Sequence, residues 1–173
     1  MTTNPELMTG LGAAASVFLS SAGSAYASIH GGEFALKSPY GFVGFSPIII
    51  GGVLSIYGLI VAVLLGGKMG NSTLEETDGY RNLSAGLSVG LACLCSGVGL
   101  GKFIKTSMTS HVALGQEADA ATRPLLGGVS TQAVAFPKSI VRILLCLCFL
   151  EAIGLYGLIV GLILMSQDSK SSE

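Results

Sequence analysis

The sequence has few charged residues. Asp, Glu, Lys and Arg together make up 11% of its 173 residues, whereas a soluble domain carries about a quarter of its residues as these four types. Half of the residues are apolar, and the mean hydropathy is strongly positive. So few charges cannot cover a water-facing surface, and we expect most of the surface to face lipid. The net charge of −1 also argues against a nucleic-acid partner, which would require a basic patch.

The sequence also lacks the usual motifs of catalysis. It contains no nucleophile–base pair, no phosphate-binding loop and no zinc-ligand spacing. Its cysteines form two C-x-C pairs inside apolar stretches, where we expect them to act as small apolar residues. We therefore expect no metal, no cofactor and no catalytic centre in this chain.

What the sequence does have is four apolar runs, each long enough for the roughly 20 residues that a membrane-spanning helix needs. They cover about 9–29, 47–67, 83–101 and 140–165. Backbone groups in hydrocarbon must be satisfied internally, so runs of this length predict helices. No Lys or Arg precedes the first run, so we expect it to remain as a span rather than to be cleaved as a signal peptide. The predicted fold is an all-α membrane protein with four transmembrane helices.

The chain contains an internal repeat. Residues 56–65 read IYGLIVAVLL and residues 155–164 read LYGLIVGLIL. Similar sequence at the end of the second and fourth runs predicts a duplicated two-helix hairpin. The first hairpin covers 1–81. The second covers 82–173 and includes a long loop at 102–139.

The distribution of Lys and Arg predicts the orientation in the membrane. The first and third loops, with the helix entry at Arg142, carry most of these residues, and the termini and the second loop carry few. An excess of positive charge marks the cytosolic side. We expect loops one and three in the cytosol and both termini in the lumen, where Asn71 would belong to a glycosylation sequon.

The first and third runs are rich in small residues at helical spacing, which lets helix backbones approach closely in a bilayer. The candidate packing residues are Gly12, Ser16, Ser20, Gly86, Gly90 and Gly97. The second and fourth runs carry bulky Ile, Leu, Val and Tyr instead. This difference favours a crowded interior for one pair of helices and a lipid-facing exterior for the other.

Glu151 is a single carboxylate near the middle of the fourth run. An ionised carboxylate at that depth costs about 3 kcal/mol even on the lenient insertion scale. Arg142 is the only basic residue of the same run, and nine helical positions place it on the opposite face, over 10 Å away along the axis. A structural ion pair within the chain is therefore poorly supplied. We expect Glu151 to be functional and to hold a proton at neutral pH.

Four segments resemble one known family. They are LEAIGLYGLIVGLIL at 150–164, SIYGLIVAVLL at 55–65, LGAAASVFLSSAGSAY at 11–26 and DGYRNLSAGLSVGLA at 78–92. In sequence and in order, they resemble the c-type proteolipid of V-type H⁺-ATPases across all four runs. The variant of this family that carries its glutamate in the second run fits less well, because that run has none.

The resemblance implies a ring of such subunits, homo- or hetero-oligomeric, with the first and third helices inside. It implies that Glu151 carries a proton, that Tyr57 hydrogen-bonds it, and that H⁺ is the transported ion. The expected partners are other proteolipids, a stator subunit bearing an arginine, the central stalk and membrane lipid. The expected location is the vacuole or another acidic endomembrane. Sodium-pumping relatives add Gln and Thr ligands, and neither residue occurs around Gly52 and Ser55.

The loop at 102–139 departs from the family pattern, because it is longer and contains neither a GDAGVR-like segment nor a following QQP. It leaves open whether the subunit couples normally to the stalk. Two other functions remain open from the residues alone. One is a stand-alone transporter that uses Glu151 as a coupling carboxylate, and the other is a membrane assembly protein in which Glu151 anchors a partner helix.

Overall fold

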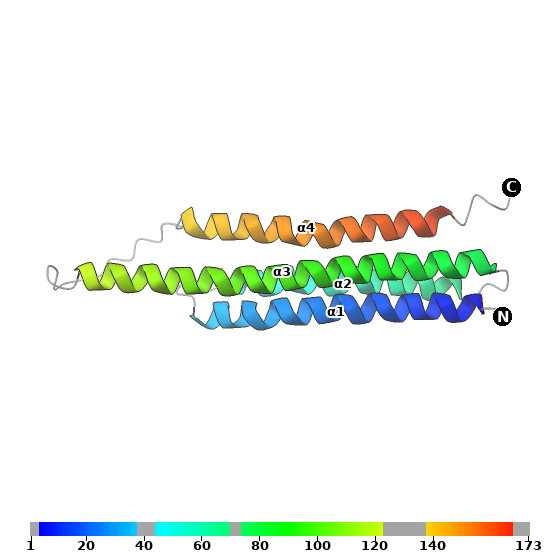
Figure 1. The fold of residues 1–173 in the computed structure, drawn as a ribbon, viewed down its shortest axis with the longest axis horizontal. Helices are drawn as coiled ribbons and strands as arrows, with labels where there is room; N and C mark the ends of the chain where they lie inside the picture. The colour runs from blue at the N-terminus through cyan, green and yellow to red at the C-terminus, as the bar shows by residue number, and fades with distance from the viewer. Residues whose placement is uncertain (1–3, 38–43, 70–73, 123–137, 168–173) are drawn as a thin grey trace.

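The computed structural model describes residues 4–37, 44–69, 74–122 and 138–167, and these residues form four α-helices and no β-strand (Figure 1). The helices are α1 (Pro5–Lys37), α2 (Ser46–Lys68), α3 (Glu76–Thr122) and α4 (Lys138–Ser166). Each is long and apolar enough to cross a membrane, α3 over Glu76–Thr109 and α4 over Val141–Ser166. The predicted all-α fold with four spans is confirmed.

Residues at the helix ends suit their positions. Pro47 lies in the first turn of α2, where its missing N–H costs no helical hydrogen bond. The first turn of α3 contains Glu76 and Asp78, whereas the last turns of α1 and α2 contain Lys37 and Lys68. Acidic residues at a helix start and basic residues at a helix end both interact favourably with the helix dipole.

The helices lie side by side, and the two chain termini lie at the same end of the bundle (Figure 1). α1 and α3 therefore run in one direction, and α2 and α4 run in the other. The most extensive packing is between α1 and α3, and α3 also contacts both α2 and α4. The two helices rich in small residues thus form the centre of the bundle.

The segment expected as a loop from residue 102 begins as helix. α3 continues without a break from Gly101 to Thr122 and projects past the other helices (Figure 1). The prediction of a loop over the whole of 102–139 was wrong in its first part. The reason is that residues 102–122 contain no proline and include Ala, Lys, Gln and Glu, which are good helix formers. The first proline after α3 is Pro124, and residues 123–137 lie outside the described part of the chain.

The contact between α1 and α3 depends on glycines that face each other in pairs. A β-carbon added at Gly12 would lie 2.8 Å from the carbonyl oxygen of Asn82, and one added at Gly86 would overlap the backbone of Gly12. Gly23 and Gly97 form the same arrangement farther along the two helices. The backbones therefore touch directly at two levels, which only glycine permits.

The two hairpins pack internally in the same way. A β-carbon added at Gly58 on α2 would overlap Ser20 and lie 2.6 Å from the carbonyl oxygen of Ser16. One added at Gly157 on α4 would overlap Ala92 and lie 3.3 Å from the carbonyl oxygen of Ser88. The alignment that pairs Tyr57 with Tyr156 pairs Gly58 with Gly157, and the alignment that pairs Ser16-Val17 with Ser88-Val89 pairs Ser20 with Ala92. Equivalent residues thus make equivalent contacts.

A second contact between the two helices of each hairpin also involves residues that the two alignments pair. On the first hairpin a β-carbon added at Gly51 would lie 2.9 Å from Cβ of Ala27. On the second, one added at Gly99 would lie 3.3 Å from Cδ2 of Leu150. In the repeat alignments, Gly51 is equivalent to Leu150 and Ala27 is equivalent to Gly99. The first hairpin therefore has two small residues at this contact, whereas the second has a leucine on α4 against a glycine on α3.

The outer surfaces of α2 and α4 are apolar. Their large exposed side chains include Ile49, Ile56, Leu59, Val63, Leu145, Phe149, Ile153 and Ile163. Side chains of this kind suit a lipid environment, as the composition of these two runs predicted.

Candidate functional site

The site is centred on Glu151, which lies near the middle of α4 and is half-buried. Its neighbours along the helix are apolar, from Leu144 to Leu150 before it and Ala152 to Leu155 after it. Because α4 is continuous through this region, the carboxyl group is held at mid-depth of a helix able to cross the membrane.

Tyr57 on α2 supplies the direct partner of this carboxyl group. The Tyr57 hydroxyl donates a hydrogen bond to Oε1 of Glu151. The two residues are 94 positions apart in the sequence and come from the second helix of each hairpin. The bond therefore joins the two hairpins at the level of the carboxyl group.

Three apolar or weakly polar residues surround the pair from the inside of the bundle. Leu54 on α2 and Cys93 on α3 are both fully buried. A β-carbon added at Gly154 on α4 would lie 2.6 Å from Cδ2 of Leu54 and 3.6 Å from Sγ of Cys93. Cys93 also lies close enough to interact electrostatically with both Glu151 and Tyr57. Gly154, one turn after Glu151, thus lets α2 and α3 close over this side of the site.

Ser96 fixes α4 to α3 next to Glu151. Its hydroxyl donates a hydrogen bond of 2.6 Å to the backbone carbonyl oxygen of Leu150. Ser96 is fully buried, and this bond crosses between two helices inside the bundle. It restricts rotation of α4, and therefore restricts the direction in which the neighbouring carboxyl group points.

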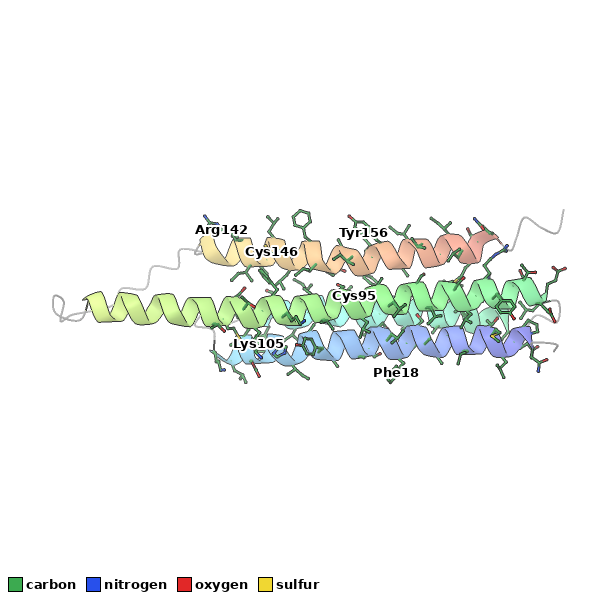
Figure 2. The ribbon with its side chains drawn as sticks, in the orientation of Figure 1. Phe18, Cys95, Lys105, Arg142, Cys146 and Tyr156 are labelled. Atoms are coloured by element: carbon green, nitrogen blue, oxygen red, sulfur yellow. The ribbon has the colours of Figure 1, made fainter. Side chains whose placement is uncertain are left out.

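The positive charges of the described chain lie away from Glu151. Arg142 is exposed near the start of α4, on the side turned away from α3 (Figure 2). At the other end of α4, Nζ of Lys68 donates a 2.8 Å hydrogen bond to the carbonyl oxygen of Met165. The ion pairs recorded among the described residues, His30–Glu33 and Arg81–Asp78, do not include Glu151. An isolated charge in apolar surroundings is energetically costly.

The structure brings Glu151 and Tyr57 together and places the six candidate packing residues at two different contacts. Gly12, Gly86 and Gly97 lie where α1 and α3 touch, and Gly90 lies there too, against Ala15 and Leu19. Ser16 and Ser20 face α2 instead and hold Gly58 between them. The hydroxyl of Ser16 donates a 3.1 Å hydrogen bond to the carbonyl oxygen of Gly58.

Sequence reasoning missed the glycines of α4 that face α2 and α3. Added β-carbons at Gly157 and Gly161 would overlap Ala92 or approach Val89 within 2.5 Å, and Gly154 packs on Leu54. The signal was present as glycines spaced three and four residues apart, 154, 157 and 161, directly after Glu151. It was overlooked because the fourth run is otherwise bulky.

Comparisons with known proteins identify the family. No protein-family model matches the chain. Among curated proteins, the V-type proton ATPase subunit c′ of Eremothecium gossypii is 34% identical over 172 residues, which cover 91% of this chain and 87% of that protein. The 16 kDa proteolipid subunit c of the V-type proton ATPase is 33% identical in Nephrops norvegicus, over 92% of this chain and 90% of that protein. The human 16 kDa proteolipid subunit c is also 33% identical, over 91% of this chain and 90% of that protein.

These similarities extend over all four apolar helices, so they concern the whole architecture and not a single glycine-rich segment. They agree with the resemblance read from the four sequence segments. The chain is an integral multi-pass membrane protein and belongs to the family of V-type proton ATPase proteolipid subunits.

Proposed function

We propose that this chain is a proton-conducting subunit of the ring in the membrane sector of a V-type ATPase, with Glu151 as the proton carrier. The observation that supports this most directly is the pair formed by Glu151 and Tyr57, half-buried at mid-depth of two apolar helices. The relatives of this chain, named as V-type proton ATPase subunits, favour this function over a stand-alone transporter or an assembly protein.

The chemistry of the site suits a carrier that alternates between two protonation states. With a proton bound, the carboxyl group is neutral and can face lipid at low cost. Tyr57 orients the carboxyl group with its hydroxyl, and Ser96 holds α4 at the adjacent turn. When the ring brings Glu151 beside a fixed cation of the stator, the ionised form is stabilised and the proton leaves. Moving each proton against 100 mV requires about 2.3 kcal/mol, which ATP hydrolysis in other subunits supplies.

The partners follow from this function. Neighbouring proteolipids complete the ring, a stator subunit supplies an arginine in the membrane, and the central stalk contacts the cytosolic end. The Lys and Arg distribution favours cytosolic loops one and three and lumenal termini. In that orientation the part of α3 beyond Gly101 projects into the cytosol, on the side of the stalk. The membrane is vacuolar or that of another acidic compartment.

The experiment is carbodiimide labelling of the assembled membrane complex, read by mass spectrometry. Carbodiimides react with protonated carboxyl groups in apolar surroundings, so we expect labelling at Glu151 that decreases as the pH rises. Glu151→Gln should remove the label and abolish ATP-driven proton pumping, while the complex still assembles. Glu33→Gln is the matched control, because Glu33 is a carboxylate on α1 whose side chain is 50% exposed. Normal pumping by Glu151→Gln would contradict the proposed role of this residue.

A further inference from the structure

The two ends of the bundle differ in how their charges are held. At the end where α1 and α3 begin, the basic residues Lys68 and Arg81 are partly buried and have partners in the chain. Lys68 donates a hydrogen bond to the carbonyl oxygen of Met165. Arg81 forms an ion pair with Asp78. The described acidic residues at this end are Glu6, Glu75, Glu76 and Asp78, so negative charge exceeds positive charge there.

The opposite end carries cations that the described chain does not balance. Its basic residues with described side chains are Lys37, Lys102, Lys105 and Arg142, and all four are exposed. Among the described residues, none of the four has a recorded ion pair or side-chain hydrogen bond. The one acidic side chain described at this end, Glu33, lies beside His30 instead. These positive charges are therefore available to an anionic partner from outside the chain.

Three of these cations lie at nearly one level along the bundle. On α4, Arg142 is eight residues before Leu150, whose carbonyl oxygen accepts the hydrogen bond from Ser96. Because α3 and α4 run in opposite directions, the same level on α3 is eight residues after Ser96, about 12 Å from that bond. That position is 104, so Lys102 and Lys105 lie within about one helical turn of Arg142 along the axis.

Two of the membrane-spanning helices begin at this level. The apolar span of α4 starts one residue before Arg142. A β-carbon added at Gly31 on α1 would lie 3.1 Å from the backbone nitrogen of Ile48, in the first turn of α2. The glycine pairs that join α1 to α3 are 74 positions apart (12 with 86, 23 with 97), which puts Gly31 level with Lys105. Lys102, Lys105 and Arg142 thus form a ring of positive charge, which we call the basic belt, at the level of the phospholipid headgroups that flank the apolar core of a bilayer.

The surface next to Arg142 suits the acyl chains of a phospholipid. Arg142 projects from α4 on the side turned away from α3 (Figure 2). Leu145 and Phe149, which are 58% and 70% exposed, follow it after three and seven residues and share its face of the helix. A phospholipid whose chains lie against Leu145 and Phe149 therefore places its phosphate beside the Arg142 guanidinium, a group that binds phosphate through two parallel hydrogen bonds. Lys105 lies on a different side of the bundle in Figure 2, so the belt can hold separate headgroups.

We propose that the basic belt binds the headgroups of anionic phospholipids, with Arg142 as the contact on the outer, lipid-facing surface. A water-soluble anion would use the charges but not the apolar surface beside them, so the level of the belt favours a lipid. Each cation near an anionic membrane surface strengthens the association about five-fold. The inference requires only that the helices cross the membrane, and it is independent of the role of Glu151.

Photochemical labelling of the assembled membrane complex tests this binding. The complex is reconstituted in phosphatidylcholine vesicles that contain a trace of photoactivatable phosphatidylserine or, in a parallel sample, the same probe with a phosphatidylcholine headgroup. The readout is the ratio of phosphatidylserine adducts to phosphatidylcholine adducts on the peptides of this chain, determined by mass spectrometry. We expect the phosphatidylserine probe to be preferred, and the preference to decrease as salt screens the charges. Equal labelling by the two probes on the unmodified chain would overturn the proposal, whatever the variants show.

Charge variants identify the residues that bind. Arg142→Gln should lower the ratio on α4 about five-fold, and Arg142→Lys should keep most of it because it keeps the charge. Lys102→Gln combined with Lys105→Gln should lower the ratio on α3. Arg81→Gln is the matched control at the other end, since Asp78 already balances that charge, and it should change neither ratio. An unchanged ratio in Arg142→Gln, or an equal decrease in Arg81→Gln, would overturn the assignment.

Two further outcomes would assign the basic belt to another partner. If inorganic phosphate lowers the ratio more than chloride at the same ionic strength, the belt binds a soluble phosphate. If Arg142→Gln leaves the ratio unchanged but releases other subunits from the complex, the belt contacts an acidic protein surface. Either result would overturn the proposed binding of lipid.

Discussion

The two hairpins have the same packing but different chemistry. Gly58 against Ser16 and Ser20 in the first corresponds to Gly157 against Ser88 and Ala92 in the second. The second hairpin carries Glu151, whereas the first carries Gly52 at the equivalent position.

The two hairpins also show that the framework of close helix contacts does not depend on the carboxyl group. The contacts are complete in the first hairpin, which lacks it. The carboxyl group occurs only in the second of these two similarly packed hairpins, and its partner Tyr57 belongs to the first hairpin. Variants that damage the common frame should affect both halves, and variants at the site should affect function alone.

The largest effect, a loss of assembled complex, is expected at the contact between α1 and α3, where the two hairpins meet. Gly86→Ala places a β-carbon inside the backbone of Gly12, and backbone cannot move aside without separating α1 from α3. Overpacking of this kind costs about 1–3 kcal/mol or more, so we expect loss of most of the assembled complex. The measurement is the amount of intact membrane complex after detergent extraction.

Gly66→Ala is the control for Gly86→Ala. An added β-carbon at Gly66 on α2 would meet no described atom within 4 Å. It should assemble as well as the unmodified chain, since alanine is also the better helix former. Equal losses for both variants would show that glycine content, and not the α1–α3 contact, governs assembly.

An intermediate effect is expected at the two equivalent tyrosines. Tyr57→Phe removes the hydrogen bond to Glu151, worth about 1 kcal/mol, so proton pumping per assembled complex should fall about five-fold. Tyr156→Phe removes a hydroxyl from an exposed ring for which no carboxyl partner is recorded among the described residues, and pumping should remain near normal. Pumping is measured as fluorescence quenching of a pH-sensitive dye in vesicles, normalised to assembled complex. A loss from Tyr156→Phe as large as that from Tyr57→Phe would remove the functional difference between the hairpins.

The sequence predicted the spans well because hydrophobic length alone determines them. It also identified Glu151, because a single charge in an apolar run is visible without any structure. Tyr57 came only from the family resemblance, since nothing in its own run marks it as the partner of a residue 94 positions away.

The remaining parts of the site depend on how the helices are rotated about their axes. Cys93 and Ser96 both lie in the third run, and their sequence neighbours Leu94 and Cys95 are equally small or apolar. Only the packed bundle shows that Cys93 and Ser96 face α4. The end of α3 was misplaced for a different reason: the loss of hydrophobicity after Gly101 does not end a helix that is rich in helix-forming residues.

The smallest effect is expected at Ser96. Ser96→Ala removes the hydrogen bond to the carbonyl oxygen of Leu150, and such bonds between membrane helices average about 0.6 kcal/mol. This energy corresponds to about a three-fold decrease in pumping if the bond acts by orienting Glu151. The matched control is Ser24→Ala. Ser24 is the residue of the first hairpin that is equivalent to Ser96, and that hairpin has Gly52 at the position equivalent to Glu151. Pumping by Ser24→Ala should stay within two-fold of normal. If both variants reduce pumping equally while assembly is unchanged, Ser96 contributes to the common frame and does not position the carboxyl group.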